Sequence, residues 1–332
     1  MKRLFILSSE RSGSNLVRHI LGNHPRGIAP VAVHFPTNLL PMQHCYRQGN
    51  HLDTEALITD MLYLARHHII PWDYDISADL VLPHVRKPGF WGCMIALYDA
   101  IASTADKSFW VCKDNRLFDY VDEIIELFPD TSFIYLVRDG RDVALSFLQV
   151  PGGPKSVTEA AQLWLAEQQA CMRVVEKYPD RCVTIRYEDL LTDPGETVKS
   201  LCERIQIPYE ATMLENFQAP SAEAQASSYW SNLDKPLLRE NFNKWKRDMS
   251  PRCAAYYQGV CAGKAGHMLQ TLGYDVLDQR YKFPLYNALK PRFDRVLKIL
   301  RYLRSRFDHI ELSRRRVKKI ALRKIRQNRC AS

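Results

Sequence analysis

The amino-acid sequence predicts an α/β fold in which a mostly parallel β-sheet is flanked by helices. Short apolar runs alternate with segments whose apolar residues recur at helical spacing, as expected for right-handed βαβ units. Hydrophobic residues make up 46% and charged residues 25% of the 332 positions, which is enough apolar material for a sizeable core. No run of about 18 apolar residues occurs, so no membrane-spanning helix is predicted.

Five apolar runs are the predicted strands: residues 4–7, 28–33, 109–112, 133–137 and 182–186. The predicted helices are residues 16–22, 121–128, 141–149 and 158–177, with another beginning near Pro194. Ligands of such sheets bind beyond the carboxyl ends of the strands. We therefore expect the polar loops after Leu7, Cys112 and Val137 to gather at one site.

The positive charge is concentrated at the C-terminus. Residues 279–332 hold 18 Lys+Arg and 3 Asp+Glu, a net charge of +15, whereas residues 1–278 hold 28 and 34, a net charge of −6. Such a shift in composition marks a boundary. The sequence therefore predicts one domain over residues 1–278 and a basic helical tail over residues 279–332.

The tail is predicted to form a basic amphipathic helix, because its apolar residues alternate in steps of four and three. They are Leu289, Phe293, Val296, Leu300, Leu303, Phe307 and Ile310. Contact with a membrane surface through residues 285–325 and packing against the acidic body are both favoured over self-pairing. No recognised nucleic-acid-binding fold accompanies the basic runs, so no nucleic-acid partner is expected.

Nine cysteines are scattered along the chain without a Cys-x-x-Cys pair. This spacing disfavours a disulfide framework or a zinc site and favours a reducing compartment. The first apolar run is too short for a secretory signal. We therefore expect a cytoplasmic protein, with peripheral membrane contact if the tail binds lipid.

The segment from Ser9 to Leu16 has the components of a phosphate-binding loop. A small, flexible loop leads into a helix N-terminus, where unpaired N–H groups favour an anion. Gly13 permits close approach, Ser12 and Ser14 add hydroxyl groups, and Arg11 adds charge. The Walker A pattern Gly-x-x-x-x-Gly-Lys-Ser/Thr is absent. The alternative is a serine-rich turn that caps the helix.

A second basic element follows the strand at residues 133–137. Arg138 lies at the predicted strand end and Ser146 lies two turns into the next helix, so both could reach one further phosphate. The alternative is a helix cap with surface charges. Together the two elements resemble the sulfotransferases that use 3′-phosphoadenosine 5′-phosphosulfate (PAPS), in particular their bacterial and tyrosylprotein branch.

Further segments match that family in the same order over about residues 3–278. They are Cys112-Lys113-Asp114-Asn115, Arg186-Tyr187-Glu188-Asp189-Leu190, Ser227-Ser228, Lys235-Pro236 and Asn243-Lys244-Trp245. The resemblance implies the P-loop-type parallel sheet of the sulfotransferase fold. It implies PAPS as the donor, 3′-phosphoadenosine 5′-phosphate (PAP) as the product, and no metal.

The resemblance also assigns roles to individual residues. The loop binds the 5′-phosphosulfate, Arg138 and Ser146 bind the 3′-phosphate, and Tyr187 lies near the adenine. Lys113 stabilises the leaving oxygen, with Arg11 as a further catalytic cation. The remaining donor-binding candidates are Ser12, Gly13, Ser14, Asn15, Leu16, Ser227, Ser228 and Lys244.

Two loop positions depart from the family pattern. Glu10 stands where Pro is usual, and Asn15 replaces a common Thr. An acidic residue beside an anion site is unfavourable unless it turns outward or pairs with a base.

His34 is the candidate general base for the acceptor. It follows the predicted strand at residues 28–33, and the Ala-Pro-x-x-x-His-Phe pattern resembles bacterial sulfotransferases with Pro-Glu-Leu-His there. Histidine suits proton abstraction near neutral pH. The alternative is a structural histidine at a strand end.

The predicted function is transfer of a sulfuryl group from PAPS to a hydroxyl or amine. The acceptor is a small molecule, a glycolipid or other lipid-linked molecule, or a carrier-bound chain, and the sequence does not distinguish these. One rival is a P-loop nucleotide kinase, although the Walker lysine is absent. Another is a non-catalytic nucleotide-binding or membrane-surface adaptor that retains the fold.

Overall fold

A five-stranded parallel sheet forms the centre of the protein, in the order β2-β5-β1-β6-β7. The computed structural model describes residues 1–49, 51–149, 153–215 and 241–277. The strands are β1 (Lys2–Ser8), β2 (Gly27–Ile28), β5 (Phe109–Lys113), β6 (Ser132–Val137) and β7 (Cys182–Arg186). A separate antiparallel hairpin joins β3 (Arg47–Gln48) to β4 (His51–Leu52). The predicted α/β fold with a parallel sheet is confirmed.

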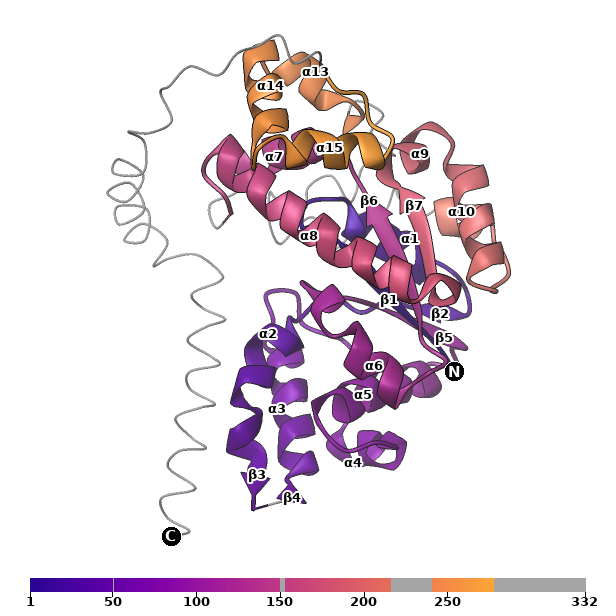
Figure 1. Cartoon of the computed structure of the whole chain (residues 1–332). Coiled ribbons are helices and arrows are strands. Elements are labelled where there is room, and N and C mark those ends of the chain that lie inside the picture. Colours follow the sequence, from indigo (N-terminus) through magenta and orange to yellow (C-terminus); the bar gives the residue numbers. More distant parts are fainter. Residues whose placement is uncertain (50, 150–152, 216–240, 278–332) are drawn as a thin grey trace.

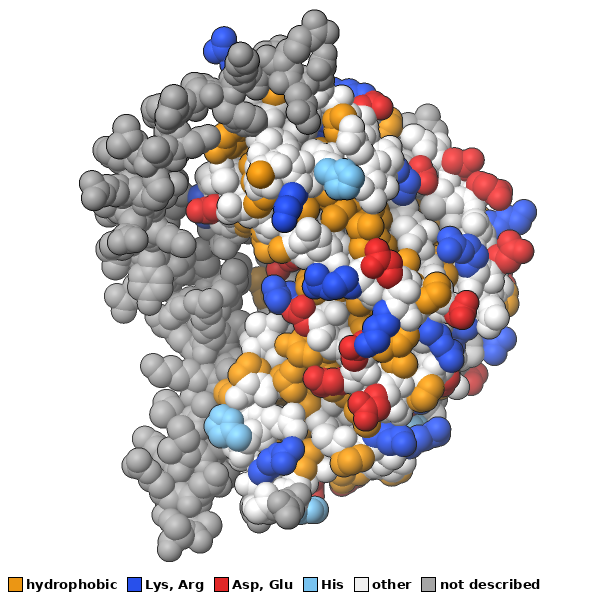
Figure 2. All heavy atoms as spheres, viewed as in Figure 1, with side chains coloured by type: hydrophobic (Ala, Val, Ile, Leu, Met, Phe, Trp, Pro, Cys, Tyr) orange, Lys and Arg blue, Asp and Glu red, His pale blue; other side chains and the backbone are white. Residues whose placement is uncertain are grey.

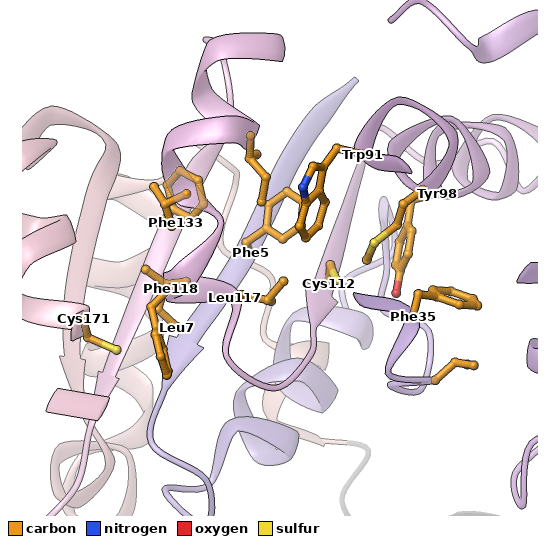
Figure 3. Close-up of a cluster of buried hydrophobic side chains, with 14 of the residues drawn as sticks. Phe5, Leu7, Phe35, Trp91, Tyr98, Cys112, Leu117, Phe118, Phe133 and Cys171 are labelled. Carbon is orange, nitrogen blue, oxygen red and sulfur yellow. The ribbon is translucent and has the colours of Figure 1, made fainter. Parts of the chain in front are cut away.

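Side chains alternate between the two faces of the sheet, and both faces are buried. In β1, Phe5 and Leu7 join the larger apolar cluster, whereas Leu4 and Ile6 join a second cluster on the opposite face. The rings of Phe5 and Phe133 stack at 5.9 Å on the larger cluster (Figure 3). The sheet is thus covered by helices on both sides.

The larger cluster is covered by most of the helices, and α8 crosses the strands on this side (Figure 1). These helices are α2 (Phe35–Leu39), α3 (Thr54–Arg66), α4 (Ala78–Val81), α5 (Phe90–Thr104), α6 (Val121–Leu127), α7 (Gly140–Leu148), α8 (Val157–Lys177), α14 (Pro251–Gly259) and α15 (Lys264–Thr271). Short 3-10 helices connect several of them at Leu40–Tyr46, Leu82–His84, Leu117–Asp119 and Pro179–Arg181.

The opposite face is covered by α1 (Ser14–Gly22), α9 (Tyr187–Thr192), α10 (Pro194–Arg204) and α11 (Thr212–Glu215). A small third cluster packs α13 (Lys244–Asp248) against α14. No helix in the described ranges is both long enough and apolar enough to cross a bilayer. Acidic and basic side chains are interspersed over the face seen in Figure 2.

The predicted strand at residues 28–33 is wrong beyond Ile28. This stretch continues from the edge strand β2 without regular secondary structure, and side chains bind two of its carbonyl groups. Arg18 donates to the Ala29 carbonyl at 2.7 Å, and the Trp72 indole donates to the Val31 carbonyl at 2.8 Å. Pro30 has no N–H group to contribute to a strand ladder.

The strand register brings the predicted loops to one edge of the sheet. Ile6 pairs with Lys113 and Ser8 pairs with Leu136, so the loop after β1 lies beside the ends of β5 and β6. The predicted tail, residues 279–332, and the candidates Ser227 and Ser228 lie outside the described residues. The domain boundary near residue 278 therefore stays a prediction.

Candidate active site

The loop between β1 and α1 leaves the N-terminus of α1 without a side-chain cap. Gly13 occupies the N-cap position, no side-chain oxygen caps the helix, and its first turn contains no acidic residue. Arg11 and Gly13 both adopt left-handed backbone conformations, with φ of 65° and 92°. Ser14, Asn15 and Leu16 form the first turn of the nine-residue helix. This end of α1 is electrostatically suited to an anion.

Arg11, Arg138 and Ser146 lie together, as predicted from the two loop motifs. The Arg11 Nε donates to the Ser146 hydroxyl at 3.1 Å, and Arg138 donates to the Arg11 carbonyl at 3.0 Å. Arg138 follows β6, whereas Ser146 lies on α7. Two guanidinium groups and a hydroxyl therefore adjoin the N-terminus of α1.

Tyr187, the first residue of α9, packs against the same loop. A Cβ atom at Gly13 would lie 2.4 Å from the tyrosine ring, so this position requires glycine for space as well as for its positive φ. The Arg138 guanidinium lies 4.2 Å from the centroid of the Tyr187 ring. The aromatic ring thus closes one side of the basic cluster.

Two buried polar groups of this cluster have no hydrogen-bond partner among the described residues. They are the Ser12 hydroxyl and the Arg138 Nε. Leaving a buried donor unsatisfied costs about 1–3 kcal/mol, and such groups call for an explanation. A bound anion would satisfy both, so these residues fit a phosphate-bearing ligand.

His34 contacts Asp114, the residue that follows Lys113 at the end of β5. The His34 Nδ1 is 2.7 Å from the Asp114 Oδ1, which also accepts from the Asn115 N–H at 2.8 Å. Asp114 is buried, whereas the His34 side chain is 37% exposed. His34 itself has φ of 60° and precedes α2, so a turn rather than the predicted strand end positions it.

Glu10, Asn115 and Glu167 also lie at the site, although the sequence assigned none of them a role there. The Lys113 ammonium donates to the Asn115 Oδ1 at 3.2 Å, and the Asn115 amide donates to Glu10 at 2.8 Å. The Glu10 N–H donates to Glu167 on α8 at 3.3 Å. The sequence could have indicated Glu167 as a buried carboxyl group, because helical spacing puts it on the same face of α8 as Trp164 and Cys171.

Lys244 is the first residue of α13, and the chain just before it reaches the basic cluster. Arg138 donates to the Asn241 carbonyl at 3.3 Å, and the Trp245 N–H donates to Asp142 on α7 at 2.7 Å. These contacts hold α13 against α7. The part of the chain that the structure describes contains no cluster of three or more candidate metal ligands.

The chain belongs to the sulfotransferase family, because the model of that family matches residues 3–211. It is 26% identical over 260 residues to a protein of Aquifex aeolicus described as uncharacterized, with 74% of this chain and 30% of that one covered. It is 25% identical over 167 residues to a protein-tyrosine sulfotransferase of Drosophila melanogaster, with 46% and 32% covered. The chain thus spans about a third of the length of these two relatives.

A longer match is protein-tyrosine sulfotransferase 1 of Danio rerio, which is 24% identical over 296 residues, with 83% of this chain and 73% of that one covered. Two solved structures share the fold at a TM-score of 0.58. The sulfotransferase domain from the curacin biosynthetic pathway is 19% identical, with 83% of this chain and 99% of that one covered. The domain from the Synechococcus PCC 7002 olefin synthase is 20% identical, with 83% and 96% covered. The predicted sulfotransferase fold is confirmed.

Proposed function

We propose that this sulfotransferase uses PAPS and transfers its sulfuryl group to a hydroxyl or amine of an acceptor. The observation that carries the proposal is the convergence of Arg11, Arg138, Ser146 and Tyr187 at the uncapped N-terminus of α1. In this proposal the loop residues hold the 5′-phosphosulfate, and Arg138 with Ser146 holds the 3′-phosphate. The unsatisfied Ser12 hydroxyl and Arg138 Nε support binding of such an anion.

The donor supplies an activated sulfuryl group for in-line displacement, and the chain supplies charge and a base. Lys113 would stabilise negative charge on the leaving oxygen, with Arg11 as a second cation. His34 would accept the acceptor proton. Its Nδ1 is engaged by Asp114, which leaves Nε2 as the nitrogen for proton transfer. No metal is part of this proposal, and Ser227, Ser228 and Lys244 are proposed to complete the donor site.

The acceptor is proposed as a class with a free hydroxyl or amine. The similarity to protein-tyrosine sulfotransferases supports a protein tyrosine as acceptor. The shared fold with sulfotransferase domains of the curacin pathway and the olefin synthase supports an acceptor within a biosynthetic system. A lipid-linked or other small-molecule acceptor remains part of the proposal. The cytoplasmic location, with peripheral membrane contact through residues 285–325, also rests on the sequence and remains a prediction.

Calorimetry with PAP on the native chain and on Arg138→Ala tests the donor class. Loss of a charged hydrogen bond costs about 1.5–3 kcal/mol, so PAP affinity should fall roughly 10- to 150-fold in the variant. Arg173→Ala, on the exposed side of α8, is the matched control and should bind like the native chain.

Three outcomes oppose the proposal in different ways. Equal affinity of the native chain and Arg138→Ala for PAP would remove Arg138 from the donor site. Absence of PAP binding with saturable binding of ATP and Mg²⁺ would support a nucleotide kinase instead. PAP binding without turnover of any hydroxyl or amine acceptor would support the non-catalytic adaptor.

A further inference from the structure

Glu10 is an acidic residue inside an anion-binding loop, where its charge opposes the bound ligand. Its carboxylate accepts a hydrogen bond from the Asn115 amide at 2.8 Å. The oxygen of the same amide accepts from the Lys113 ammonium at 3.2 Å. The Asn115 side chain therefore connects Glu10 to Lys113, because its amide nitrogen donates to the carboxylate and its amide oxygen accepts from the ammonium.

The connection joins two separate segments of the site. Glu10 lies in the loop after β1, whereas Lys113 ends β5, and the two strands are neighbours in the sheet. The amide orientation is fixed by its partners, because an ammonium requires an acceptor and a carboxylate requires a donor. Holding Lys113 through Asn115 thus restrains the ammonium relative to the phosphate-binding loop.

Lys113 needs a nearby negative charge because its surroundings oppose ionisation. Burial lowers the pKa of Lys113, and the guanidinium groups of Arg11 and Arg18 lower it further. Asp114 and Glu10 are the carboxylates that raise the pKa of Lys113 again. Glu10 is therefore one of two carboxylates that favour the charged form of Lys113, against burial and two neighbouring guanidinium groups.

One oxygen of Asp114, Oδ1, already has two other partners. Its Oδ1 lies 2.7 Å from the His34 Nδ1 and 2.8 Å from the Asn115 backbone nitrogen. If His34 is protonated during turnover, the charge of Asp114 is offset by the imidazolium. Glu10 then becomes the carboxylate whose charge is available to Lys113.

A further carboxyl group, that of Glu167, lies next to Glu10. Glu167 is 3% exposed and accepts from the Glu10 N–H at 3.3 Å. Burial, and then the charge of Glu10, raises the pKa of Glu167 to about 8, while the charge of Arg116 lowers it. At neutral pH Glu167 is thus mainly protonated, and it adds little negative charge beside Glu10.

We infer that Glu10 is a positioning residue for sulfuryl transfer, which acts through Asn115 to hold Lys113 in place and in its charged form. The inference rests on the proposed function, since it assigns Lys113 to the leaving oxygen. It accounts for a residue that is otherwise unfavourable in this loop.

The test measures the ionisation of Lys113 directly and needs no acceptor. Competitive labelling with acetic anhydride over a pH series, read by mass spectrometry, gives the pH at which Lys113 loses its proton. In Glu10→Gln, which retains an acceptor for Asn115, we expect this midpoint to fall by about one pH unit, a change of tenfold in the proton equilibrium. Glu126→Gln, an exposed change on α6, is the matched control.

Asn115→Ala gives a second route to the same result. It removes the connection but keeps the Glu10 charge, so the midpoint should fall in the same direction by a smaller amount. PAP affinity of Glu10→Gln at neutral pH should equal or exceed that of the native chain, because an opposing charge is removed. An unchanged Lys113 midpoint in Glu10→Gln would overturn the inference, as would a loss of PAP affinity without a shift in the midpoint.

Failure of the proposed function has a different signature. A native chain that does not bind PAP would refute the PAPS donor, while the labelling midpoints would still report whether Glu10 and Lys113 are coupled. A native chain that binds PAP, with equal midpoints in the native chain and Glu10→Gln, would refute the inference alone.

Discussion

Glu167 is a carboxyl group on the buried face of α8. It is 3% exposed on α8, and Trp164 and Cys171 on the same helix are fully buried. Burial raises the pKa of Glu167 from 4.5 to about 8. The sequence contains the residue but not its surroundings, because the contact with the Glu10 N–H joins positions 157 residues apart. Its perturbed ionisation could not be predicted from local pattern.

The raised pKa of Glu167 makes the stability of the protein depend on pH. Since the folded state binds this proton more tightly than the unfolded state, the contribution of Glu167 to stability is fully present at low pH and is lost as pH rises from about 4.5 to about 8. Each pKa unit corresponds to about 1.4 kcal/mol, so the loss is on the order of a few kcal/mol. Glu167→Gln removes the titration, and we expect its free energy of unfolding to exceed that of the native chain increasingly from pH 5 to pH 8.5.

Urea unfolding of both chains at several pH values measures this difference. Glu176→Gln is the matched control, because Glu176 lies on the same helix but is exposed. The control should follow the native chain at every pH. A constant difference between Glu167→Gln and the native chain would contradict the predicted linkage.

At the scale of elements, prediction succeeded where the apolar pattern alone determines the structure. The strands β5, β6 and β7 agree with the predicted runs to within one residue. Of these, β5 and β6 lie inside the sheet, where strands buried on both faces are expected to be apolar throughout. The edge segment at residues 28–33 has a similar pattern, yet Arg18 and Trp72 bind its carbonyl groups in place of a neighbouring strand. Such long-range side-chain contacts leave no periodic signal.

In the candidate site, too, the features set by strand topology were predicted, whereas those set by long-range side-chain contacts were not. The loops that carry Arg11, Lys113 and Arg138 were predicted to meet, because parallel strands deliver their carboxyl ends to one edge. Their meeting is confirmed by the strand register. The turn that positions His34 was not predicted, because it depends on the hydrogen bond to Asp114, 80 residues away.

The loop between β1 and α1 packs against Tyr187 of α9. Gly13 has φ of 92°, and a Cβ there would lie 2.4 Å from the Tyr187 ring. We expect Gly13→Ala to lower the free energy of unfolding by about 1–3 kcal/mol, the usual cost of a residue held in a sparsely populated conformation. Thermal or urea unfolding measures the loss.

Gly195→Ala provides the comparison for that loop. Gly195 lies at the start of α10 with nothing within 4 Å of an added Cβ, so its substitution should leave stability unchanged or slightly raised. If Gly13→Ala proved as stable as Gly195→Ala, the loop would not be fixed against α9 in the way described.

At the scale of the whole molecule, the larger N-terminal part of the chain is acidic and the C-terminal part is strongly basic. Residues 1–278 carry a net charge of −6 and residues 279–332 carry +15. The basic cluster around Arg11 and Arg138 is therefore a local positive region in a domain that is acidic as a whole. In the proposed function the local arrangement of these residues, rather than net charge, attracts the donor, whereas the basic tail is predicted to bind an anionic surface.

Removal of residues 279–332 changes the formal net charge from +9 to −6. Each Lys or Arg near an anionic membrane contributes about 1 kcal/mol, so the full chain should sediment with phosphatidylserine-containing vesicles and the shortened chain should not. High salt should weaken the binding, since it screens the attraction. PAP affinity should be equal in both chains, because Arg11, Arg138 and Ser146 lie within residues 1–278. If the tail instead packs against the acidic body, the full chain will not bind vesicles and its removal will lower the melting temperature.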